Sequence, residues 1–184
     1  TDTNRRISFP YTKMMNANMV VDMGAAIILC SVEKAREIRI PEEKWVYHLA
    51  GVQGNDHFSA SVRDNFYSSP GLGLVGKRVM ELSKVSPEEI DYVDLYSCFP
   101  SAVQIAAREL GFSEKRQLTV TGGLTFGGGP LNNYVMHAVA RTAELLRRAS
   151  GKKAFVSANG GNLYKHVHCV YSSRAVSYTH LRAH

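Results

Sequence analysis

The sequence has few cysteines and no long apolar run, and these absences exclude several classes of protein. Among its 184 residues there are three cysteines, Cys30, Cys98 and Cys169, too few and too scattered to suggest a disulfide framework or a metal site. No apolar run approaches the roughly 20 residues that span a membrane, and no signal-peptide pattern is present. We therefore expect a protein of the reducing cytoplasm, with no membrane span.

The chain also lacks any concentration of charge of one sign. Its 22 basic and 16 acidic residues give a formal net charge of +6, but the basic residues are scattered. They do not form a stripe with interleaved aromatic residues, so we predict no nucleic-acid partner; an anionic ligand remains compatible with this charge. The composition, 45% hydrophobic and 21% charged, is typical of a globular domain with one sizeable core.

Strand and helix patterns alternate along the chain. The apolar run 23–31 predicts a buried central strand, and helical spacing follows it at 32–40, 72–85 and 134–148. Further strands are predicted at 45–52, within 86–98, before the glycine-rich turn of 118–133, and at 153–161 and 163–173. This order predicts an α/β domain over residues 23–175, with a mixed, mainly parallel five-stranded sheet flanked by helices. Residues 1–22 are expected to end a preceding segment.

The last nine residues, VSYTHLRAH, resemble a translated sequencing-library adapter. We therefore exclude residues 176–184 from the domain and expect them to pack against nothing. The chain lacks an initiator methionine and begins like the middle of a gene. Together these features lead us to expect a fragment of a longer protein.

The stretch DLYSCFP, residues 94–100, joins a predicted strand to a predicted helix. Pro100 lies in the first turn of that helix and Gly111 follows its end. The phenol of Tyr96, the hydroxyl of Ser97 and the thiol of Cys98 thus stand at the carboxyl end of a strand. Ligands of open α/β sheets bind at this edge, which makes these side chains candidates for a functional site.

Four stretches occur in the order found in one superfamily: NANMVVDMGAAIIL, DLYSCF, TGGLTFGGGP and SANGG. Over residues 5–174 the chain resembles the C-terminal half of the thiolase superfamily, and above all the acetyl-CoA acetyltransferases of the sterol-carrier-protein type. The resemblance implies a fold of two similar halves, with the nucleophilic cysteine on an N-terminal half that this chain does not contain. It also implies acyl-CoA as substrate, no separate cofactor, that N-terminal half as partner, and a homodimer when full-length.

The resemblance assigns roles to two residues of YSCF. Cys98 matches the acid/base cysteine of the HDCF motif, and a helix amino terminus beside it would favour the thiolate. Tyr96 stands where HDCF has histidine and the related NEAF motif has asparagine, the residue that positions a water in the oxyanion hole. A phenol can also donate one hydrogen bond. A buried small side chain and a packing tyrosine are the alternatives, and Ser97 is expected to be a local cap.

Gly129 replaces the histidine of the GHP motif, which thiolases use to activate the nucleophile. His166 and His137 are the candidate substitutes, with His168 on the same predicted strand face as His166. A structural histidine is the alternative for each. We expect Cys98, Gly129, Asn159 and His166 to converge on one pocket.

The remaining candidates come from three turns. Asn159 belongs to the turn that replaces the Cys-x-Gly motif, and is either an oxyanion contact or part of a tight hairpin. Gly128 and Asn133 belong to the glycine-rich run that lies against the substrate in thiolases. Asn18 matches a position that faces coenzyme A there.

Three functions remain open at this stage. The chain is either part of an acyl-CoA acyltransferase of lipid or sterol side-chain metabolism, inactive without its other half, or part of a retro-aldolase in which Tyr96 transfers protons. The third possibility is a non-catalytic subunit that binds acyl-CoA or a partner protein, since the GHP histidine is lost. One superfamily fold hosts several reactions, so the fold alone does not decide between them.

Overall fold

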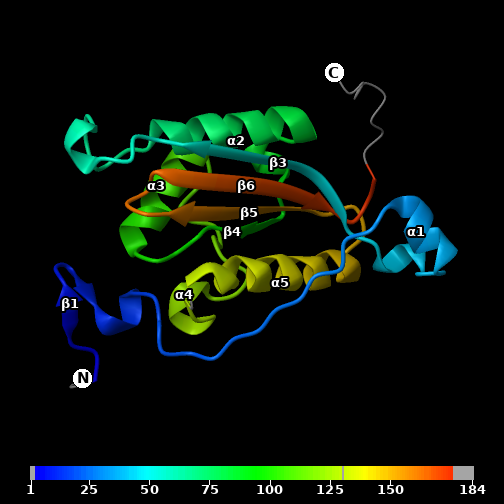
Figure 1. The fold of residues 1–184 in the computed structure, drawn as a ribbon, viewed down its shortest axis with the longest axis horizontal. Helices are drawn as coiled ribbons and strands as arrows, with labels where there is room; N and C mark the ends of the chain where they lie inside the picture. The colour runs from blue at the N-terminus through cyan, green and yellow to red at the C-terminus, as the bar shows by residue number, and fades with distance from the viewer. Residues whose placement is uncertain (1–2, 130, 176–184) are drawn as a thin grey trace.

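The computed structural model describes residues 3–129 and 131–175, and these form a three-layer α/β domain preceded by an extended N-terminal arm (Figure 1). The central sheet has the strand order β3-β6-β5-β4. In chain order its strands are β3 (Tyr47–Asn55), β4 (Tyr92–Asp94), β5 (Lys153–Gly160) and β6 (Lys165–Ser172). The helices are α1 (Val32–Glu37), α2 (Pro70–Ser83), α3 (Pro100–Leu110), α4 (Gly123–Phe126) and α5 (Tyr134–Arg148). A small hairpin in the arm pairs β1 (Arg6–Ser8) with β2 (Tyr11–Thr12).

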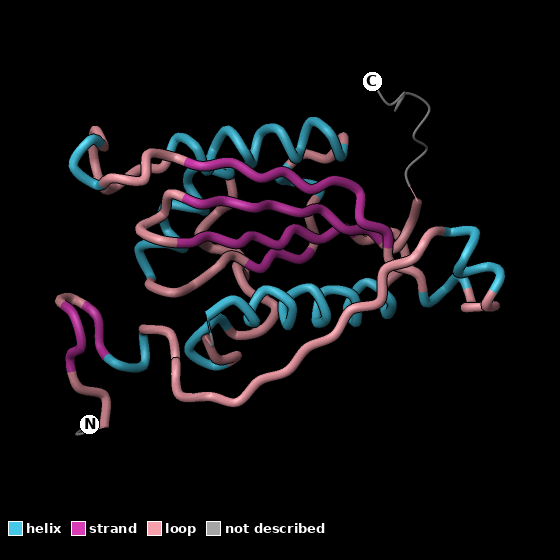
Figure 2. Tube along the Cα trace, in the orientation of Figure 1, coloured by secondary structure: helices cyan, strands magenta, loops and turns pink. Residues whose placement is uncertain are grey.

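Helices α2 and α3 cover one face of the sheet, and α5 covers the other (Figures 1 and 2). The larger core cluster lies on the α2 and α3 side, where Val79, Ala107 and Phe155 are fully buried. The smaller cluster lies under α5 and is built on Leu124, Tyr134, Ala138 and Val156. Helix α5 coincides with its predicted range, because apolar residues recur along one face of it while its charged residues face solvent.

The predicted turn chemistry accounts for the helix ends. Pro70 and Pro100 stand in the first turns of α2 and α3, where their missing N–H groups cost no hydrogen bond. Helix α3 ends at Gly111, which adopts φ +74°. Ser31 caps α1 by accepting a hydrogen bond from the Lys34 N–H at 3.1 Å. None of the helices in the described residues is long and apolar enough to cross a membrane.

The α/β class is confirmed, but the predicted sheet was wrong in two details. The described residues form four strands in this sheet, not five, and most of the pairing is antiparallel. Only β4 and β5 pair in parallel, while β6 runs antiparallel to both β3 and β5. The segment before the glycine-rich turn contributes one bond to the edge, from the Leu95 N–H to the Leu118 carbonyl at 2.9 Å, and forms no ladder.

The run 23–31 is not the predicted buried strand. It is extended but unpaired, and it passes along α5 toward α1, away from the sheet (Figure 1). Ile28 and Leu29 are 89% and 84% exposed. A continuous apolar run indicates a strand only if a sheet edge lies beside it to exchange hydrogen bonds, and sequence composition does not report that neighbour.

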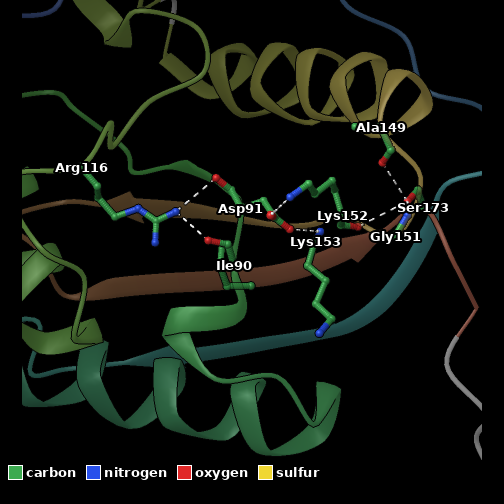
Figure 3. Close-up of polar contacts among 8 residues, drawn as sticks. All are labelled: Ile90, Asp91, Arg116, Ala149, Gly151, Lys152, Lys153 and Ser173. Carbon is green, nitrogen blue, oxygen red and sulfur yellow. Dashed lines mark hydrogen bonds and ion pairs between the residues drawn. The ribbon is translucent and has the colours of Figure 1, made fainter.

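The amino ends of β4 and β5 are tied together at the edge opposite the candidate site (Figure 3). Asp91 accepts hydrogen bonds from Lys152 Nζ at 2.6 Å and from the Lys153 N–H at 2.9 Å. Arg116 donates to the carbonyls of Ile90 and Asp91. These contacts fix the register of the single parallel pair, whose carboxyl ends carry the candidate site.

Candidate functional site

The site is assembled where β4 and β5 end. The loop 95–99 joins β4 to α3, and Asn159 lies near the end of β5. The glycine-rich segment 122–129 and the arm residues 16–18 pack against this loop. Backbone hydrogen bonds join these three segments. The Ala17 N–H donates to the Cys98 carbonyl, the Asn18 N–H donates to the Leu124 carbonyl, and the Gly129 N–H donates to the Asn18 carbonyl. The arm is therefore part of the site.

The thiol of Cys98 points at Asn159, whose Oδ1 lies 3.8 Å from Sγ. Burial raises the pKa of this thiol, and the backbone N–H groups of Phe99 and Cys98 lower it by less. The expected preference for thiolate at the start of α3 is thus outweighed by desolvation. Cys98 is therefore expected to be a neutral thiol at neutral pH, with a proton that it can donate.

Tyr96 is held on three sides. Its backbone N–H donates to Ser157 Oγ at 3.0 Å, its ring packs edge-on against Tyr134 with centroids 5.5 Å apart, and its hydroxyl lies 3.4 Å from the Leu131 carbonyl. Burial, and to a lesser degree the nearby Cys98, raise the pKa of the phenol. Tyr96 therefore stays protonated and can donate a hydrogen bond at the site.

Ser97 does not cap its own helix. Its Oγ accepts a hydrogen bond from the Leu124 N–H at 3.0 Å, in the short helix α4. A Cβ on Gly123 would lie 2.7 Å from that oxygen, so the turn needs glycine there. Ser97 thus fixes the glycine-rich turn relative to Cys98.

The glycines of the run are required by close packing. A Cβ on Gly128 would lie 2.5 Å from Met23 Sδ, and one on Gly129 would lie 3.0 Å from Leu124 Cδ2 and 3.1 Å from Ala17 Cβ. A side chain at position 129 would therefore press against both Leu124 and the arm. Pro130, the last residue of the motif, and residues 176–184, expected to be an adapter-derived tail, lie outside the described residues.

Three further candidates lie around the arm and α5. Asn18 is exposed, and its Oδ1 accepts from the Val20 N–H at 3.2 Å. Asn133 donates from Nδ2 to the Met23 carbonyl at 2.8 Å, so its amide is used to hold the arm. His137 has a buried Nε2 with no hydrogen-bond partner in the described part of the chain. Their roles in binding substrate stay predictions.

His166 is bound by partners other than Cys98. The register pairs it with Asn159, but its Nε2 lies 3.2 Å from both Asp56 Oδ2 and Ser69 Oγ, at the start of α2. Cys98 instead packs with the cluster under α5. Of the four residues expected to converge, Cys98 touches Asn159, and Gly129 is joined to Cys98 through the arm. His166 makes no contact with Cys98, and its catalytic role stays a prediction.

His168 is 1% exposed and packs on the Phe155 ring, with centroids 5.2 Å apart. Burial, and then the neighbouring His166, lower its pKa to about 4. Because the folded pKa lies below the ordinary value of about 6.5, neutral His168 favours folding above pH 6.5. That contribution to the free energy of unfolding is lost as pH falls toward 4. The loss is about 1.4 kcal/mol per pH unit, or about 3 kcal/mol in all.

We predict that His168→Phe abolishes most of this acid sensitivity. The free energy of unfolding of the unmodified chain, measured by urea at pH 7 and pH 4.5, should fall by about 2 kcal/mol more than that of the variant. His57→Phe, at an exposed position, is the control and should keep the full pH dependence. Equal pH dependence in all three chains would contradict the neutral state of His168.

A buried polar cluster beneath the site was missed by the sequence reasoning. Asp94, at the end of β4, is fully buried and accepts hydrogen bonds from Tyr134 Oη at 2.7 Å, Thr119 Oγ1 at 2.9 Å and the Val120 N–H at 2.9 Å. Thr119 Oγ1 also accepts from the Gly123 N–H at 2.9 Å. Burial raises the pKa of the Asp94 carboxyl, while these donors oppose the shift. The cluster ties the glycine-rich turn to β4 and α5.

A cavity of about 360 Å³ opens beside this turn, on the α3 side of Ser97. Its walls include Leu95, Val103 and Leu118, with Thr119 and Gly123 from the turn. In the described residues, no group of three or more His, Cys, Asp or Glu side chains is placed to hold a metal ion.

Comparisons with known proteins agree with this fold. The chain is 32% identical to an SCP2-thiolase like protein type 1 from Mycobacterium smegmatis; the match has a TM-score of 0.83 and covers 96% of this chain and 39% of that one. It is 24% identical to the acetyl-CoA acetyltransferase of Methanothermobacter thermautotrophicus over 81% of this chain and 43% of the relative. It is 29% identical to a steroid side-chain-cleaving aldolase of Thermomonospora curvata, over 71% of this chain and 36% of the relative.

No protein-family model matches the sequence. The chain spans less than half the length of the curated relatives named above. The shared fold nevertheless extends over nearly all of the chain. The chain belongs to the thiolase superfamily and corresponds to the C-terminal half of its members.

Proposed function

We propose that the chain supplies the acid/base half of a thiolase-like acyl-CoA acyltransferase, of the acetyl-CoA acetyltransferase type, in lipid or sterol side-chain metabolism. The observation that carries the proposal is the neutral Cys98 thiol directed at Asn159, at the carboxyl ends of β4 and β5. The nucleophilic thiolate would come from an N-terminal half of the complete protein. Coenzyme A thioesters are the proposed substrates, with no separate cofactor.

In the thiolytic direction, the nucleophilic thiolate attacks the 3-oxo carbon of a 3-oxoacyl thioester. The bond between the second and third carbons then breaks, the acyl group stays on the nucleophile, and the enolate of the departing thioester takes the proton of Cys98. Coenzyme A next attacks the acyl-enzyme, and its thiol proton reprotonates the Cys98 thiolate. Run in reverse, the Cys98 thiolate removes the α-proton that condensation requires.

Asn159 is suited to stabilise the enolate oxygen. Its Oδ1 accepts from the thiol, so its Nδ2 group is left to donate to an oxyanion beside Cys98. Tyr96, kept protonated by burial, is a second possible donor if its hydroxyl turns from the Leu131 carbonyl toward the substrate. Gly129 supplies no base, so the nucleophile would have to be activated by groups of the other half.

A retro-aldolase is the second candidate, and the tyrosine at position 96 favours it. In that reaction the bond between the second and third carbons of a 3-hydroxyacyl thioester would break to release a ketone or aldehyde, and Cys98 would protonate the enolate. The protonated Tyr96 phenol would relay the hydroxyl proton of the substrate to the Cys98 thiolate that this leaves. The relative named steroid side-chain-cleaving aldolase makes this reaction a specific alternative. A non-catalytic acyl-CoA-binding or partner-binding subunit is the third.

The test joins the chain to its own N-terminal half and compares products. We expect the chain alone to show no thiolysis of acetoacetyl-CoA, because it lacks the nucleophile. The joined protein should form two thioesters from a 3-oxoacyl-CoA and coenzyme A, and we expect it to be a homodimer. Release of a ketone or aldehyde from a 3-hydroxyacyl-CoA would favour the aldolase. Binding of acyl-CoA without turnover would favour the non-catalytic subunit. Thiolysis by the chain alone would contradict the division between the halves.

A further inference from the structure

Ser157 is a buried serine in the apolar stretch of β5. The residue is 3% exposed, and both of its neighbours in the strand, Val156 and Ala158, are apolar. A buried hydroxyl without a partner costs free energy, so the contact that satisfies it is informative. Ser157 Oγ accepts a hydrogen bond from the backbone N–H of Tyr96 at 3.0 Å. The serine thus reaches the loop that carries Cys98.

This hydrogen bond continues the pairing of β4 with β5 beyond the last backbone pair. The register of the parallel ladder ends at Asp94 and Val156. The next N–H along the chain, that of Leu95, donates to a carbonyl of the segment before the glycine-rich turn and so points away from β5. Successive N–H groups of an extended chain alternate between its two sides, so the Tyr96 N–H is the one directed at β5. Ser157 Oγ accepts from it where a longer ladder would offer a carbonyl.

The same face of β5 also contacts the thiol. Ser157 and Asn159 are two positions apart in the strand, so their side chains lie on one face. Ser157 Oγ holds the loop at the backbone of Tyr96, and Asn159 Oδ1 lies 3.8 Å from the Sγ atom of Cys98, two positions further on. A thiol is a weak hydrogen-bond donor, so its contact with Asn159 cannot fix the loop by itself. The shorter, buried bond at Ser157 can.

We propose that Ser157 is a positioning residue, which holds the Cys98 thiol beside Asn159 through the backbone of Tyr96. The kinetic part of this role rests on the proposed function, in which Cys98 gives its proton to the enolate. Proton transfer needs the donor within hydrogen-bond reach of the acceptor, and a displacement of about 1 Å can slow a reaction about a hundredfold. Removing Ser157 Oγ takes the acceptor of the Tyr96 N–H away and frees the loop to shift.

The first test measures acyl transfer in the protein joined to its N-terminal half. Ser157→Ala removes the acceptor with little change in volume. We expect kcat to fall about tenfold, the size of one lost buried hydrogen bond, while KM changes little. In a Cys98→Ala background the same substitution should lower kcat no further, because Ser157 acts through the thiol. An equal loss in both backgrounds would overturn the proposal.

Ser172→Ala is the matched control. Ser172 is a buried serine of β6, 4% exposed, and its Oγ also accepts a backbone N–H at 3.0 Å, from Arg174. It pairs with Lys153 at the amino end of β5, the end opposite the site. The variant loses the same kind of bond without touching the loop, so its kcat should stay near normal. A similar fall of kcat in Ser172→Ala and Ser157→Ala would assign both serines to the stability of the fold and overturn the positioning role.

A second readout does not depend on catalysis. Iodoacetamide alkylates the free cysteines of the chain, and mass spectrometry of its peptides gives the rate for Cys98 relative to the half-buried Cys169. Ser157→Ala should raise this ratio about tenfold, because the thiol is no longer held, and Ser172→Ala should leave it unchanged. An unchanged ratio in Ser157→Ala would overturn the proposal, even in a protein that transfers acyl groups. A raised ratio in a joined protein that transfers none would refute the proposed function and keep Ser157 as the residue that positions Cys98.

Discussion

Replacing Cys98 by alanine should lower the rate of acyl transfer by about 10²–10⁴-fold in the protein joined to its N-terminal half. This is the range for removing a positioned general acid or base. The thiol is the one proton donor that contacts Asn159 in the described residues, and its loss leaves the enolate without a proton source. Cys98 transfers its proton to the enolate only as the carbon–carbon bond breaks, so its role lies in the transition state and not in substrate binding. We therefore expect kcat to fall much more than KM rises.

Cys169→Ala is the matched control for this experiment. Cys169 is also a half-buried free cysteine whose pKa is raised by burial, but it lies on β6 opposite Gly51, away from the site. We expect this variant to keep near-normal kcat. If Cys98→Ala and Cys169→Ala behaved alike, Cys98 would be a packing residue, and proton transfer would have to be assigned to Tyr96.

The fold class and the motif loop could be predicted because local patterns carry them. Helix α5 shows a helical repeat over its whole length, and α3 is bounded by Pro100 and Gly111, so their ranges follow from residue types alone. The pairing of strands could not be derived in this way. A strand that helices cover on both faces can present an apolar run whichever way its neighbours run, and the run 23–31 shows that a run with strand composition need not have a strand beside it.

The contact between Cys98 and Asn159 could be expected from two motifs, whereas the buried cluster beneath it is distant in sequence and was missed. Cys98 and Asn159 are 61 positions apart but belong to two recognisable turns. Asp94 precedes Tyr96 by two positions, yet its partners Thr119 and Tyr134 belong to other elements, and no local pattern joins them. A buried aspartate at a strand end, followed along the chain by two threonines beside paired glycines, was the available signal.

Asp94→Ala should lower the free energy of unfolding by about 3 kcal/mol, the second large effect that we expect. The substitution leaves the Val120 N–H without its acceptor and removes one partner each from Tyr134 and Thr119. Asp94 and Tyr134 are fully buried, and Thr119 and Val120 are partly buried. Each stranded buried donor costs about 1–3 kcal/mol, and the remaining bonds between the threonines and the tyrosine recover part of this. Urea unfolding at pH 7 measures the difference.

Asp91→Ala is the control. It removes a carboxylate close to Asp94 in the sequence, but this carboxylate belongs to a solvent-exposed ion pair. Its bonds to Lys152 and Lys153 lie at the surface, so the loss should be about 1 kcal/mol or less. Asp94→Asn should fall between the two, since the amide can still accept from Tyr134 but presents N–H groups to the Val120 N–H. If Asp94→Ala were no more destabilising than Asp91→Ala, the buried cluster would not hold the turn beside Ser97, and the geometry of Cys98 would have to rest on the arm alone.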